Sequence, residues 1–89
     1  MNPVRASDVE QVLRAALDPS RLEVIDDSDK HAGHAGAREG RHFTVRVTSA
    51  RFNGLTRVAR HRLVYSALHG LIAQGIHAIA IDARSPDEP

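Results

Sequence analysis

The stretch HFTVRVT, residues 42–48, decides the fold of this chain. Its apolar and polar residues alternate one by one, which is the two-residue period of a strand with one covered face. The apolar set is Phe43, Val45 and Val47, and the polar set is His42, Thr44, Arg46 and Thr48. The pattern predicts a strand that packs one face against helices and leaves the other open.

Two further strands are predicted on either side of this one in the sequence. Residues 21–25 alternate in the same way and end in an acidic turn, so we expect them to pair with 42–48 as an antiparallel hairpin. Residues 76–83, IHAIAIDA, are apolar at nearly every position. A continuous apolar run is typical of a strand covered on both faces, and this strand is therefore expected to be more buried than the other two.

Helical spacing of apolar residues appears in two places. Ser7 and Glu10 form a capping-box pattern that predicts a helix over 7–17, before Pro19. A second helix is expected from a Thr56 cap to Gly75. One stripe of that helix carries His61, Val64, Tyr65, Leu68, Leu71 and Ile72.

The expected order is therefore α, β, β, α, β. We predict an α+β fold of two layers, in which the helices cover one face of a three-stranded sheet. The length of 89 residues suits one domain over residues 1–89, with a polar tail from about residue 84 that we expect to fray.

Composition excludes several classes of function. The net charge of +1 is not that of a polycation, so attraction to nucleic acid requires a local basic cluster. The chain has no cysteine, and therefore no disulfide and no thiol nucleophile. No P-loop, GxSxG or HExxH motif is present, and Asp26, Asp27 and Asp29 suit a solvated turn better than an acid–base pair. Without a signal peptide pattern or a run of roughly 20 apolar residues, we expect a soluble cytoplasmic protein.

Six histidines without any cysteine are the clearest chemical signal. His77 opens the strand at 76–83, and His31 and His34 lie in a glycine-rich loop. Such histidines supply nitrogen ligands to a metal, but the sulfur of a zinc or iron–sulfur centre would have to come from a second protein. Read from the residues alone, His77 also suits a strand-end histidine in contact with solvent, and the loop suits a solvated connector. His42 and His69 are assigned to the surface.

Four basic residues crowd the first turns of the helix predicted after Thr56, where the helix dipole disfavours cations. These are Arg57, Arg60, His61 and Arg62. They predict a site for an anionic group of a partner, such as a carboxylate or a phosphate. The alternative is that His61 is partly buried while the arginines pair with the acidic turn at 26–29.

Five segments in this order resemble the BolA family over nearly the whole chain. They are DDSDKHAG (26–33), HFTVRVTS (42–49), RFNGL (51–55), RHRLVYSAL (60–68) and IHAIAI (76–81). The resemblance implies a class II KH-like fold. Gly54 in RFNGL departs from the GXXG loop of nucleic-acid-binding KH domains, which weakens any transfer of RNA binding from the fold.

The same resemblance implies a non-enzymatic partner of a monothiol glutaredoxin. In such a heterodimer a 2Fe–2S cluster is held by the glutaredoxin cysteine, by glutathione and by the BolA-like chain. The family's ligands fall on His77 and on His31, with His34 as an alternative loop ligand. Arg57, Arg60, His61 and Arg62 would then belong to the docking or glutathione-facing surface, and the role would be cluster transfer or iron regulation.

A second hypothesis is a DNA-binding transcriptional regulator of stress, morphology or biofilm genes. It also follows from the resemblance, and its support among the residues is the basic start of the helix after Thr56. The near-neutral charge and the lack of aromatic stacking residues on a basic face count against it.

Overall fold

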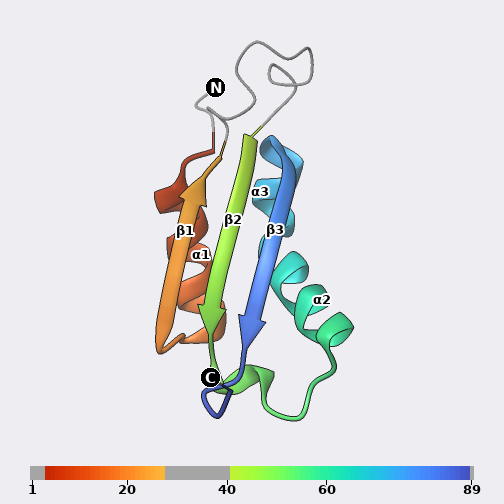
Figure 1. Cartoon of the computed structure of the whole chain (residues 1–89). Helices are drawn as coiled ribbons and strands as arrows, with labels where there is room; N and C mark the ends of the chain where they lie inside the picture. Colours follow the sequence, from red (N-terminus) through yellow and green to blue (C-terminus); the bar gives the residue numbers. More distant parts are fainter. Residues whose placement is uncertain (1–3, 28–40, 89) are drawn as a thin grey trace.

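The computed structural model of the chain describes residues 4–27 and 41–88. Its elements follow the order α1 (Ala6–Leu17), β1 (Arg21–Asp26), β2 (Arg41–Thr48), a 3-10 turn η3 (Ala50–Phe52), α2 (Arg57–Ala67), α3 (His69–Gln74) and β3 (Ile76–Arg84). Figure 1 shows the three strands side by side, with the helices behind them. No helix of the described residues covers the other face of the sheet.

β2 is the central strand of the sheet. It pairs with β1 antiparallel and with β3 parallel, in the order β1-β2-β3. Phe43, Val45 and Val47 of β2 are buried against the helices, as the alternation predicts. The α+β fold of two layers and the antiparallel hairpin are thus confirmed.

The core lies between the sheet and the helices. Its completely buried members come from α1, β2, η3, α2 and the residue that follows α2. The core residues are Val4, Val9, Leu13, Leu17, Phe43, Val45, Val47, Phe52, Val64, Leu68 and Ile76. Ser49 is buried among them, where its Oγ donates to the carbonyl of Leu17 (2.6 Å) and accepts from the amide of Arg51 (3.1 Å).

The helix starts differ in part from those expected. Thr56 caps α2 as predicted, because its Oγ1 accepts from the amide of Ala59 (3.1 Å). The box built on Ser7 is wrong: α1 begins after Arg5, and Asp8 accepts from the Arg5 amide (2.9 Å). Asp8, three residues after the Arg5 cap, therefore makes the hydrogen bond that was expected of Glu10.

The single helix expected from Thr56 to Gly75 is two helices. At Leu68 the chain leaves the helical range, with φ −92° and ψ 5°, and α3 begins at His69. Leu68 is buried at this bend, while Tyr65 is 42% exposed rather than part of the buried stripe.

One expectation about the C-terminal region is also wrong. β3 is an edge strand, in which half-buried Ile79, Ile81 and Ala83 alternate with exposed residues, and it is not buried on both faces. In the tail, Ser85 is 7% exposed, and its Oγ donates to the carboxylate of Glu88 (2.9 Å).

Candidate functional site

A β-bulge places His77 at the start of β3. Arg41 pairs with Ile76 but His42 pairs with Ala78, so His77 is an extra residue in β3 at this point. A bulge re-aims a side chain and breaks the alternation of a strand. His77 therefore does not follow the direction of Ile79 and Ile81, although the sequence gives all three the same parity.

The ring of His77 lies against the ring of His42. The two ring centroids are 5.1 Å apart, and the planes are tilted by 49°. His42 has the strand parity of Thr44 and Arg46, which lie on the uncovered face of the sheet, and it is half-buried while His77 is exposed. His42, which the sequence assigned to the surface, is thus the neighbour of the predicted ligand.

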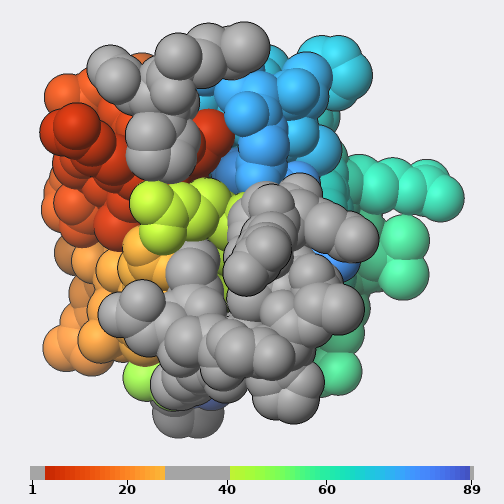
Figure 2. All heavy atoms as spheres, turned by 90° about the horizontal axis from the view of Figure 1, so that it is seen from above, coloured from red at the N-terminus to blue at the C-terminus, as the bar shows by residue number. Residues whose placement is uncertain are grey.

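The segment that carries His31 and His34 lies outside the described residues, but both of its ends are fixed beside this pair. The amide of Asp27 donates to the carbonyl of His42 (2.8 Å), and the amide of Arg41 donates to the carbonyl of Gly75 (2.9 Å). The chain thus leaves β1 and enters β2 at the same end of the sheet as His77. Figure 2 looks down on this end of the molecule.

The donor set at this end fits part of a metal centre. Within residues 4–27 and 41–88, no three His, Asp or Glu side chains converge to hold a metal ion. His77 and His42 offer imidazole nitrogens, and the chain has no cysteine to offer thiolate. The described residues at this end thus bring together two imidazoles, which are fewer donors than a four-coordinate metal centre needs.

The four predicted anion-binding residues differ in their exposure to solvent. Arg57 and Arg62 are exposed on α2, whereas His61 and Arg60 are half-buried. Side chains of α2 project from the side of the molecule opposite α1 (Figure 2). The acidic turn is not the partner of Arg60, because Asp26 forms an ion pair with Arg41 (3.5 Å) and Arg60 forms one with Glu88 (2.6 Å).

Arg60 is fixed at the opposite end of β3 from His77. Its Nε donates to the carbonyl of Leu55 (3.1 Å), and its NH1 donates to that of Ala83 (3.1 Å). Ala83 is six residues beyond His77 in the strand, which corresponds to roughly 20 Å. Figure 1 likewise shows α2 beginning toward the end of the sheet where β3 finishes. Arg60 and the histidine pair therefore lie at opposite ends of β3.

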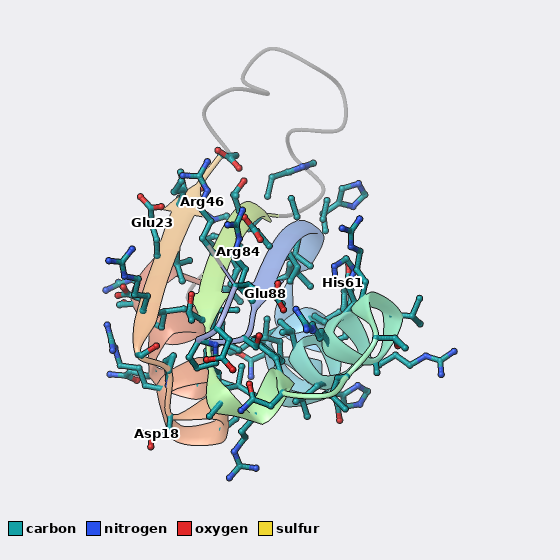
Figure 3. All side chains as sticks on the ribbon, turned by 60° about the horizontal axis from the view of Figure 1, so that its bottom comes forward. Asp18, Glu23, Arg46, His61, Arg84 and Glu88 are labelled. Carbon is teal, nitrogen blue, oxygen red and sulfur yellow. The ribbon has the colours of Figure 1, made fainter. Side chains whose placement is uncertain are left out.

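The uncovered face of the sheet carries a broad hollow of about 1090 Å³ near the end of β3. Charged side chains cross it in pairs: Arg46 binds Glu23 (3.3 Å), and Arg84 binds Asp82 (3.0 Å). Figure 3 shows Glu23, Arg46 and Arg84 following one another across this face. The hydrogen bond and charge of Asp82 raise the pKa of Arg84, so that cation stays charged.

Comparison with known proteins now identifies the family. The family model described as BolA-like protein matches residues 13–88. The chain belongs to the BolA-like family. Human BolA-like protein 1 is 42% identical, over 97% of this chain and 61% of that protein. A Sinorhizobium protein described as uncharacterized, in the cobS 5′ region, is 40% identical and is matched over 90% of its length.

Solved BolA structures have the same fold. The BolA domain of SufE1 from Arabidopsis thaliana superposes with a TM-score of 0.85 at 40% identity, covering 100% of both chains. The solution structure of mouse BolA1 gives 0.74 at 42% identity, covering 91% of this chain and 64% of that one. The chain spans only 24% of SufE-like protein 1, which is described as chloroplastic/mitochondrial. None of the helices in the described residues is long and apolar enough to cross a membrane.

Proposed function

We propose that this BolA-like chain is a non-enzymatic partner of a monothiol glutaredoxin and supplies histidine ligands to a shared 2Fe–2S cluster. The observation that carries the proposal is the exposed His77, set on a bulge beside the ring of His42. The proposed role is cluster transfer or iron regulation. It requires a compartment that holds the glutaredoxin and glutathione, such as the cytoplasm.

The roles of the chain's own residues follow from their positions. His77 is the proposed fixed ligand, because two strands and a bulge hold its backbone. His31, or His34 three residues further on, is the proposed second ligand, because their segment begins and ends beside His77. The cluster would bring the iron and inorganic sulfide, and the thiolates would come from the glutaredoxin and glutathione.

His42 is proposed to set the orientation of the His77 ring. A ring packed against a ligand restricts the directions that its nitrogens can take, and such neighbours tune a metal site without binding the metal themselves. His42 also links the site to the loop, since its carbonyl accepts from the amide of Asp27 at the point where the loop departs.

The proposal is tested by visible circular dichroism of cluster-bound glutaredoxin, titrated with this protein and with its His31→Ala and His34→Ala variants. The expected result is a new spectrum that saturates at one to one and is lost or altered in only one of the two loop variants. That variant identifies the loop ligand. An unchanged spectrum with the wild-type protein, together with no heat of binding in calorimetry, would remove the proposal.

A second candidate function is DNA binding in a transcriptional regulator. It is favoured by the start of α2, where Arg57 and Arg62 are exposed and no acidic residue occurs in the helix. Salt-dependent binding to a defined operator, weakened by Arg57→Gln and Arg62→Gln, is the expected result. Equal, weak affinity for every sequence would reject operator recognition.

A further inference from the structure

The carboxylate of Glu88 is held by three donors at the C-terminal end of the sheet. Its Oε1 lies 2.6 Å from NH1 of Arg60, and it accepts from both Oγ (2.9 Å) and the amide (3.4 Å) of Ser85. The amide of Glu88 in turn donates to the carbonyl of Ser85 (3.1 Å). Residues 85–88 thus form a closed turn that presents one carboxylate to α2.

This turn covers the one arginine of the α2 start that is not exposed. The side chain of Arg60 is only 15% exposed, whereas Arg57 and Arg62 of the same helix are open to solvent. Arg57 lies three residues before Arg60 and therefore on the same side of the helix. Figure 3 shows Glu88 close to Arg84, and both residues line the hollow of the open face.

The carboxylate that pairs with Arg60 belongs to the C-terminal tail and not to a helix or a strand. The carbonyls of Leu55 and Ala83 fix the position of the guanidinium, but they do not neutralise its charge. A planar guanidinium binds carboxylate and phosphate oxygens by the same geometry. The position of the Glu88 carboxylate is thus an oxyanion-binding site.

We propose that the Glu88 carboxylate occupies this oxyanion-binding site and competes with other anions for Arg60. It thereby weakens the binding of polyanions, such as a nucleic-acid backbone, to the start of α2. When the Glu88 carboxylate is withdrawn, Arg60 joins Arg57, which lies on the same side of the helix, as a phosphate-binding residue. The inference goes beyond cluster binding and needs no recognition of a particular DNA sequence. It makes the tail an autoinhibitory contact.

The test measures the affinity for a mixed-sequence DNA duplex of about 20 base pairs by fluorescence anisotropy, over a range of salt. Glu88→Gln is expected to bind several-fold more tightly than the wild-type protein and to steepen the salt dependence by about one unit, as one more phosphate contact does. Asp87→Asn is the matched control, because it removes the same charge from an exposed neighbour. It is expected to change the affinity much less.

Two further variants make the result decisive. Glu88→Asp keeps the net charge but shortens the side chain by one methylene, and it is expected to show part of the gain. Arg60→Gln in the Glu88→Gln background is expected to cancel the gain. Equal gains in Glu88→Gln and Asp87→Asn, or no gain in either position 88 variant while urea unfolding shows both to be folded, would overturn the proposal.

Discussion

The rings of His42 and His77, from neighbouring strands, have centroids 5.1 Å apart at the end of the sheet where residues 28–40 leave and return. The bulge at the start of β3 pairs His42 with Ala78, and His77 is the extra residue beside that pair.

His42→Ala is expected to shift the nuclear magnetic resonance signals of the His77 ring in the free protein, since it removes the ring that packs against it. His42→Phe keeps an aromatic ring there and should leave a smaller change. His69→Ala, a change at an exposed residue of α3, is the control. His77 signals that are identical in all three variants would show that the contact does not persist in solution.

Two valines of α2 test the packing of the core. Val64 is fully buried and Val58 is 60% exposed, so the same substitution samples both environments. Val64→Ala is expected to lower the free energy of unfolding by about 2 kcal/mol, from lost burial and the cavity left behind. Val58→Ala should leave it nearly unchanged or slightly raised, because alanine favours helix. Urea unfolding measures both, and equal losses would contradict the packing described here.

Ser49 tests the buried polar link between β2 and α1. Its hydroxyl joins the carbonyl of Leu17 to the amide of Arg51, and Ser49→Ala leaves both groups without this partner. The expected loss of unfolding free energy is about 1–3 kcal/mol. Ser66→Ala, on the exposed side of α2, is the matched control and should cost almost nothing. A Ser49→Ala protein as stable as the control would show that the link contributes nothing.

The tail contact predicts a pH dependence of stability. The hydrogen bond from Ser85 and then that from Arg60 lower the pKa of Glu88 below its ordinary value. A carboxylate with a lower pKa in the folded state stabilises the fold above its unfolded pKa, and this contribution is lost as the pH falls through the folded pKa. In urea unfolding, the difference in stability between wild type and Glu88→Gln should therefore shrink from neutral to acid pH. A difference that is independent of pH would mean that the charge of Glu88 does not act on stability.

The features that local sequence dictates were predicted well. The alternation of Phe43, Val45 and Val47 gave β2 and its buried face, and Thr56 gave the start of α2. The order of elements then limited the architecture to helices on one face of a three-stranded sheet. These features depend on residues only a few positions apart, and the sequence shows such periods directly.

The features that depend on distant contacts were missed. The pairing of Arg60 with Glu88 joins residues 28 positions apart, and neither residue type reveals its partner. The bulge at His77 is a property of the pairing of β2 with β3, so the contact with His42 could not be derived from either strand alone. In β3, the alanines were counted as apolar and therefore as buried. This concealed the alternation of small exposed residues with half-buried isoleucines. The bend at Leu68 was missed because no proline marks it.

The most direct test of the account is the visible circular dichroism of cluster-bound monothiol glutaredoxin titrated with His77→Ala and with His69→Ala. Both substitutions remove one exposed imidazole, so they are matched in charge and size. We expect His69→Ala to give the same new spectrum at one to one as the wild-type protein, and His77→Ala not to give it. A full spectral change with His77→Ala would contradict the role of His77 as a cluster ligand.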